Sequence, residues 1–85
     1  MKVLIPSPLR SYTGAREVEA RGETLAAAFL DLERHYPGFR FRVIDEQERL
    51  RPHIRCFVNG EQVFDLSRPL RFGDEVQLVQ ALSGG

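Results

Sequence analysis

A helical hydrophobic pattern lies between Thr24 and Pro37 and is the clearest signal in the chain. Apolar side chains recur there at helical spacing, at Leu25, Ala28, Phe29, Leu32 and Tyr36. This spacing predicts an amphipathic helix that starts at the N-cap Thr24 and ends before Pro37-Gly38. The opposite face carries polar residues, so we expect the apolar stripe to pack on a sheet; these residues are Asp31, Glu33 and Arg34.

Two short apolar segments precede this helix and predict strands. Val3-Leu4-Ile5 is a β-branched and aliphatic run that ends at Pro6. After a turn, the segment 16–20 alternates charged residues with Val18 and Ala20, which would share one face. Together the two segments predict an opening hairpin.

The chain after the helix contains an alternating segment and a charged connection. The alternation has period 2 and predicts a strand, with Phe39, Phe41 and Val43 separated by Arg40, Arg42 and Ile44. Residues 45–51 are rich in charge and are expected to connect this segment to the next element.

The last third of the chain predicts strands separated by turns. Ile54–Val58 has a strand pattern that ends at the turn pair Asn59-Gly60, and residues 61–63 would return from it. A second turn at Phe72-Gly73-Asp74 leads into 75–81, which alternates with Val76 and Leu78 inward. The order is two strands, one helix and two or three further strands, which predicts an α+β sheet covered by one helix.

Composition restricts the class of protein. The 85 residues suffice for one small domain, and 12 basic and 12 acidic side chains give zero net charge, which argues against nucleic-acid binding. No apolar run approaches the length of a signal peptide or a membrane span, so we expect a soluble, cytoplasmic protein without membrane contact. The single cysteine, Cys56, excludes an internal disulfide and a cysteine-based metal cluster.

The sequence ends in Ser83-Gly84-Gly85, and the diglycine predicts chemistry at the terminal carboxylate. Glycine has no Cβ, so two in succession fit a slot too narrow for any side chain. The reactive group inside such a slot is the unhindered carboxylate of Gly85. This pattern points to a reaction performed on the chain by another enzyme; the other interpretation is a frayed terminus or a cloning remnant.

Three motifs together resemble those of the MoaD/ThiS family of ubiquitin-like sulfur carriers. They are the Asn59-Gly60 turn, the run Phe72-Gly73-Asp74-Glu75-Val76 and the terminal Gly84-Gly85. The segments 9–14 and 35–38 are similar to MoaD-like carriers of the CysO type in particular. The resemblance implies a ubiquitin-like β-grasp fold in residues 1–82, a mixed sheet of four to five strands covered by one main helix, followed by a flexible tail at 83–85.

The resemblance also implies the chemistry. An E1-like enzyme would use ATP and magnesium to adenylate Gly85, and a sulfur source would then convert the adenylate to a thiocarboxylate. A second enzyme would accept the sulfur, such as the large subunit of molybdopterin synthase, a thiazole synthase or a cysteine synthase. The chain itself would need no catalytic residue, no bound metal and no permanently bound cofactor.

Partner recognition is expected on the sheet face opposite the helix, close to the tail. Val79, Ala81 and Leu82 lie on or just after the last strand, and Phe57 shares their face if Cys56 points inward. Apolar patches with an aromatic centre are typical of protein interfaces. Scattered exposed apolar side chains are also ordinary, and a register slip of one residue would exchange the two faces.

Other candidate residues have ordinary structural explanations. An arginine set could dock an acidic partner, but acidic neighbours favour an internally compensated surface; the set is Arg40, Arg42, Arg49, Arg51 and Arg55, among Asp45, Glu46 and Glu48. Cys56 is expected to be buried in the core rather than reactive. His35 can interact with carbonyls at its helix end, and with His53 it does not form a metal site.

Two alternatives to the carrier stay open. A ubiquitin-like modifier would undergo the same activation but would transfer Gly85 to lysines as an isopeptide. Lys2 is the sole lysine of the chain, which disfavours polymeric chains of such a modifier. An inert interaction domain would have no tail chemistry, so removal of Gly84-Gly85 would change nothing.

Overall fold

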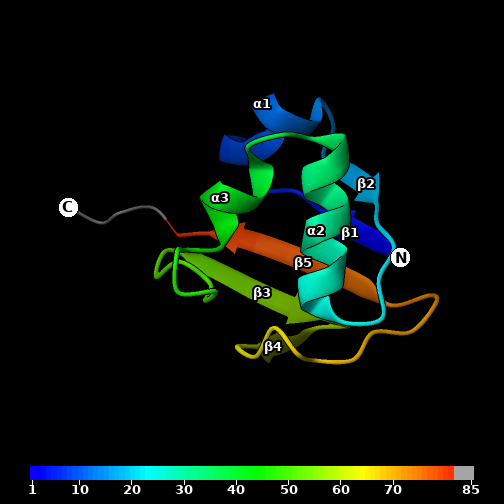
Figure 1. Cartoon of the computed structure of the whole chain (residues 1–85). Helices are drawn as coiled ribbons and strands as arrows, with labels where there is room; N and C mark the ends of the chain where they lie inside the picture. The colour runs from blue at the N-terminus through cyan, green and yellow to red at the C-terminus, as the bar shows by residue number, and fades with distance from the viewer. Residues whose placement is uncertain (82–85) are drawn as a thin grey trace.

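The protein is built on one mixed five-stranded sheet in the order β2-β1-β5-β3-β4. The strands are β1 (Lys2–Leu4), β2 (Glu17–Glu19), β3 (Ile54–Val58), β4 (Glu61–Val63) and β5 (Glu75–Gln80). The computed structural model describes residues 1–81. β1 and β5 are parallel, the other neighbouring strands are antiparallel, and β5 lies at the centre of the sheet (Figure 1). The predicted α+β fold with a mixed sheet is confirmed.

The main helix, α2 (Leu25–His35), forms where the sequence predicts it. Thr24 is its N-cap, and the hydroxyl oxygen of Thr24 accepts a hydrogen bond of 3.2 Å from the backbone N–H of Ala27. The predicted pairing of the first two strands is also confirmed. The connection between them is longer than a turn, because it contains a 3-10 helix, η1 (Ser7–Leu9), and a short helix, α1 (Arg10–Thr13).

The core lies between α2 and one face of the sheet (Figure 1). Alternation along β5 places Val76 and Leu78 in the core and leaves Glu75 and Gln77 exposed, as predicted. The remaining sheet and helix positions of the core are also nearly all apolar; the largest fully buried side chains include Phe29, Leu25, Leu32, Val3 and Val58. The other face of the sheet carries solvent-exposed side chains, among them Arg55, Gln77 and Val79.

The strand predicted over 39–44 is wrong, because this segment forms helix α3 (Phe39–Val43). Phe39 and Val43 are both fully buried, whereas Phe41 between them is 59% exposed. A strand would place all three on one face, but a helix places only positions i and i+4 together. Gly38 enters the helix with φ of 94°, and the carboxylate of Glu33 on α2 accepts hydrogen bonds from the N–H groups of Gly38 and Arg40, both at 2.9 Å.

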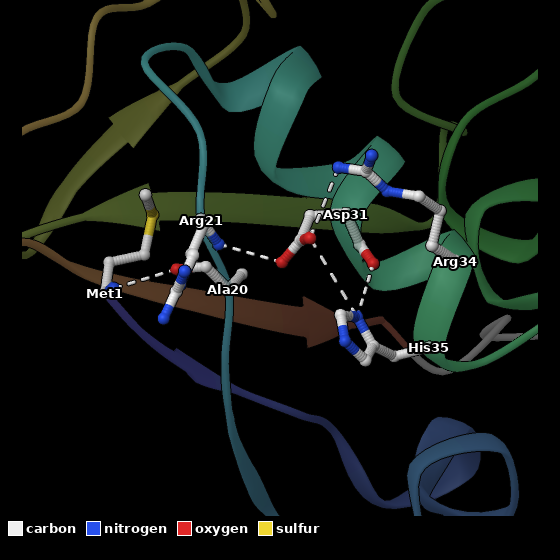
Figure 2. Close-up of polar contacts among 6 residues, drawn as sticks. All are labelled: Met1, Ala20, Arg21, Asp31, Arg34 and His35. Carbon is white, nitrogen blue, oxygen red and sulfur yellow. Dashed lines mark hydrogen bonds and ion pairs between the residues drawn. The ribbon is translucent and has the colours of Figure 1, made fainter.

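Asp31 is not part of a solvated helix face, as its position in the sequence predicted, but is only 8% exposed. Figure 2 shows its carboxylate between the segment before α2 and the end of that helix. One oxygen accepts a hydrogen bond of 2.9 Å from the N–H of Arg21, and the other lies 3.3 Å from Nη2 of Arg34 and 3.9 Å from Nδ1 of His35. Asp31 therefore joins α2 to the connection between β2 and α2.

Candidate functional site

The chain emerges from the centre of the sheet at Ala81, the last residue that the structure describes. Gln80 is still paired with Ile54, and the N–H of Ala81 donates a hydrogen bond of 2.8 Å to the carbonyl of His53. The residues predicted to carry the chemistry, Gly84 and Gly85, lie outside the described part, and so does Leu82. The candidate site is therefore the surface around Ala81, which we call the tail root.

The sheet face opposite α2 carries the apolar residues predicted near the tail. Cys56 points into the core, so Phe57 points to the opposite face, where it is half-buried. Phe57 is paired with Gln77, and Val79 follows two residues later on the same face of β5. Val79 is 37% exposed, and Ala81 is half-buried. The structure thus brings Phe57 and Val79 together as diagonal neighbours close to the tail root.

Leu4 belongs to the same surface but was not identified from the sequence. It is paired with Gln77 from the β1 side, whereas Phe57 is paired with Gln77 from the β3 side. The three side chains form one row across the sheet, with half-buried Leu4 and Phe57 on either side of Gln77. We call Leu4, Phe57, Val79 and Ala81 the sheet patch. Only the parallel pairing of β1 with β5 reveals that Leu4 belongs to it.

A groove borders the sheet patch where η1 approaches β5. It has a volume of about 530 Å³ and is lined by Leu4, Pro6, Arg10, Arg16, Val79 and Gln80, among others. Nε of Arg10 donates a hydrogen bond of 3.0 Å to the carbonyl of Ile5, which fixes this side chain on one wall. The groove and the patch together form an uneven surface with apolar and basic character.

The arginine set is compensated less completely than the sequence predicted. Arg40 is paired with Glu48, but Arg42 lies over the ring of Tyr12 at 5.9 Å and Arg51 over the ring of Phe41 at 4.6 Å. Within residues 1–81, no carboxylate lies within 4.0 Å of the charged groups of Arg49, Arg51 or Arg55. Among the described residues, Arg40 with Glu48 is thus the one ion pair between this arginine set and its acidic neighbours, and a solvated surface stays the prediction for the rest.

Within the described residues, Cys56 and the histidines form neither a reactive thiol site nor a metal site. Cys56 is fully buried, as predicted, and burial raises the pKa of its thiol to about 12, so it is not a nucleophile at neutral pH. Nδ1 of His35 lies 2.9 Å from the carbonyl oxygen of Asp31, which confirms the predicted contact at the helix end (Figure 2). Among residues 1–81, no group of three or more His, Cys, Asp or Glu side chains is arranged to hold a metal ion.

The described surface is suited to binding. At the tail root it presents apolar side chains and arginine guanidinium groups, which can contact a protein partner. None of the helices in the described residues is both long enough and apolar enough to cross a membrane.

Comparison with known proteins identifies the relatives of this chain. The model of the ThiS family matches residues 3–85. The sulfur carrier protein CysO of Mycobacterium tuberculosis strain H37Rv is 36% identical over 89 residues, which cover 98% of this chain and 96% of that protein. Such relatives are named as carriers and not as enzymes, in agreement with the prediction that this chain is a carrier.

Solved structures show the same fold. In the crystal structure of the Amycolatopsis orientalis BexX/CysO complex, the matching chain has a TM-score of 0.91 and 34% identity, with 99% of this chain and 98% of that chain covered. SAMP1 from Haloferax volcanii matches with a TM-score of 0.80 and 30% identity, with 100% and 98% covered. The sheet order and these similarities confirm the ubiquitin-like β-grasp fold. This chain belongs to the ThiS family of ubiquitin-like sulfur carriers.

Proposed function

We propose that this protein carries sulfur as a thiocarboxylate on its C-terminal Gly85, after adenylation by an E1-like enzyme. The observation that carries the proposal is the family match, which extends through Gly84-Gly85 to residue 85. The 36% identity to CysO sulfur carriers over 98% of the chain supports it further. We place the reaction in the cytoplasm.

The carboxylate of Gly85 needs activation because oxide is a poor leaving group. A carboxylate oxygen would attack the α-phosphorus of ATP, held with magnesium by the E1-like enzyme, and pyrophosphate would leave. Sulfide or a persulfide sulfur would then attack the carbonyl carbon of the acyl-adenylate, and AMP would leave. With a persulfide, reductive cleavage of the S–S bond by a thiol then releases the thiocarboxylate. The carrier itself supplies no catalytic group.

The described surface supplies the recognition that such a reaction requires. We assign the sheet patch, together with Leu82, to docking of the partner enzymes, while residues 83–85 enter the active site. The patch combines an aromatic centre at Phe57 with the exposed Val79, and such anchors often dominate interface energetics. The BexX/CysO complex supports the idea that proteins of this family bind partner proteins as intact domains.

The sulfur acceptor is the second partner. The acceptor classes implied by the family are the large subunit of molybdopterin synthase, a thiazole synthase and a cysteine synthase. Each would bind the carrier through the same tail and take the sulfur from the thiocarboxylate.

The experiment is intact-mass analysis of the protein isolated from its own host, combined with a reagent that captures thiocarboxylates. A fraction with sulfur in place of one oxygen at Gly85 is the expected result. A variant lacking Gly85 should show no such fraction. If the native terminus is never adenylated or thiolated in the host, the carrier function is contradicted.

A second candidate function is protein modification through Gly85, and the similarity to SAMP1, a small archaeal modifier protein, favours it. Self-conjugation through a side chain would require Lys2. Its Nζ lies 3.8 Å from a carboxylate oxygen of Glu17 and 3.9 Å from one of Glu75, so conjugation at Lys2 would have to break both ion pairs. Larger species linked through Gly85 to lysines of other proteins, found in the same mass analysis, would support the modifier function.

A further inference from the structure

A hollow of about 330 Å³ lies at the edge of the sheet, where β4 ends at Val63 and, within the described residues, the first residues of β3 have no partner on that side. β4 pairs only with residues 56–58 of β3, so the beginning of β3 at Ile54 and Arg55 extends past the end of β4. The connection between α3 and β3 closes the other side through Leu50 and Arg51. We call this hollow the edge pocket.

The edge pocket has a strongly positive lining. Arg49, Arg51 and Arg55 contribute to it, and none of its lining residues is acidic. Elsewhere in the described residues, some arginines have acidic partners, as in the pairs of Arg34 with Asp31 and Arg68 with Glu61, and others have none; the edge pocket gathers three of the unpaired kind around one hollow. Within residues 1–81, no carboxylate lies within 4.0 Å of these three arginines, although the chain as a whole has no net charge. Their combined positive charge attracts an external anion.

Two of the arginines are held in place before any partner binds. Nε of Arg51 donates a hydrogen bond of 2.6 Å to the carbonyl of Phe41, and its guanidinium lies over the Phe41 ring. Nη1 of Arg55 donates a hydrogen bond of 2.7 Å to the carbonyl of Pro52. Each guanidinium keeps further N–H donors, and prior ordering lowers the entropy lost when they bind a carboxylate.

The edge pocket also has apolar surface. Leu50, Ile54 and Val63 contribute to its lining, and the ring of Phe64 at its rim is 76% exposed. A free phosphate or other small anion would leave this apolar surface unused. A peptide segment that carries an aliphatic or aromatic side chain between carboxylates would match both parts of the lining.

The edge pocket adjoins the tail root. Ile54, in its lining, is paired with Gln80, and His53 accepts the hydrogen bond from Ala81. An enzyme that receives the tail must therefore pass close to the arginines.

We propose that the edge pocket receives an acidic segment of the E1-like adenylating enzyme, in which carboxylates flank an apolar side chain. This inference rests on the proposed function and adds a second contact to the sheet patch. The arginines attract and orient the enzyme, and Phe64 with the apolar lining holds the central side chain of the segment.

The first test needs no enzyme. We would titrate the ¹⁵N-labelled protein with the acetylated, amidated peptide DELEDF and with its uncharged counterpart NQLQNF. We expect amide shifts centred on Leu50, Ile54 and Phe64, with affinity about tenfold weaker for the uncharged peptide. Equal affinity for the two peptides, or shifts centred elsewhere, would overturn the inference.

The second test uses ATP–pyrophosphate exchange by the E1-like enzyme of the same organism. The variant combining Arg49→Glu with Arg55→Glu should raise the KM for the carrier about tenfold at low salt and leave kcat unchanged. Both side chains are exposed, and thermal unfolding would confirm that the variant is folded. Phe64→Ala should raise KM without changing its salt dependence.

The matched control combines Arg21→Glu with Arg71→Glu, which alters net charge equally at the end of the sheet far from the tail root. If both double variants behave alike while the wild type supports exchange, the edge pocket is not the contact and the inference is wrong. If the wild type supports no exchange, the proposed adenylation fails, and the peptide titration alone decides what the pocket binds. Self-association of the wild type that is lost in the Arg49/Arg55 variant would show a second copy as occupant and would also overturn the inference.

Discussion

The side-chain amide of Asn59 donates a hydrogen bond of 2.9 Å to the carboxylate of Asp74. The amide oxygen of Asn59 in turn accepts a hydrogen bond of 2.9 Å from the N–H of Glu75. These contacts join the turn after β3 to the turn before β5, although the two turns lie far apart in the sequence. The Asn-Gly and Gly-Asp-Glu-Val motifs that reveal the family therefore stabilise the fold and position the strand that leads to the tail.

Asn59→Gly should lower the free energy of unfolding by about 1–2 kcal/mol, because both side-chain hydrogen bonds are lost. Asn59 has a φ of 51°, which glycine adopts without strain, so the substitution isolates the side chain. Urea denaturation measures the effect, and Gln47→Gly would serve as the control, because Gln47 is also an exposed turn residue and lacks these bonds. Unchanged stability of the Asn59 variant would contradict this structural function of the motif.

Glu33→Gln should reduce stability at neutral pH and flatten its dependence on acid. The N–H groups of Gly38 and Arg40 lower the pKa of Glu33, so its ionised form stabilises the folded state above the unfolded pKa of about 4.3. That contribution is lost as the pH falls through the lowered folded pKa. Thermal unfolding between pH 3 and 7 should show the two proteins converging in acid; a constant difference would contradict the prediction.

Cys56→Ala should cost about 1–2 kcal/mol of stability and leave sulfur transfer intact. The thiol is fully buried and should react with a disulfide reagent only after unfolding. Burial raises the pKa of Cys56 to about 12 in the folded protein. The stability that the buried neutral thiol contributes is therefore complete below the unfolded pKa of about 8.5, and it declines at higher pH because the thiol of the unfolded chain ionises first. Loss of the thiocarboxylate in the variant would show that Cys56 takes part in sulfur delivery.

Val79→Asp should weaken binding of the adenylating enzyme about tenfold, since it places a charge in the sheet patch. Val79 is partly exposed, so stability should change by about 0.5 kcal/mol or less. Leu30→Asp is a matched control, because Leu30 is also an exposed apolar residue but lies on α2, on the other side of the sheet. Equal binding by the two variants would show that the sheet patch is not a docking surface.

Much of the fold follows from local signals in the sequence. The Thr24 cap, the apolar spacing up to Tyr36 and the alternation of Val76 and Leu78 each specify one element, and each is present. The strand prediction for the segment 39–43 is wrong because its pattern is ambiguous. Apolar residues at every second position include pairs four apart, so five residues fit both the period of a strand and that of a helix. Gly38 and the contact with Glu33 decide in favour of a helix, and these depend on tertiary structure.

The candidate site was less accessible to prediction for a topological reason. Phe57 and Val79 could be placed on one face from the alternation of single strands. Leu4 could not, because its membership depends on the parallel pairing of β1 with β5 across most of the chain. The edge pocket likewise depends on where β4 stops and on how the connection after α3 returns to β3, which no local pattern encodes.

The position of β5 also has a mechanical consequence. β5 is hydrogen-bonded along both edges, to β1 and to β3, and it is the strand that leads to the tail (Figure 1). An enzyme that draws the tail into a slot pulls along the axis of this strand and loads two rows of hydrogen bonds in shear. An edge strand under the same traction could peel away one bond at a time. The carrier can therefore be held by its end and remain folded.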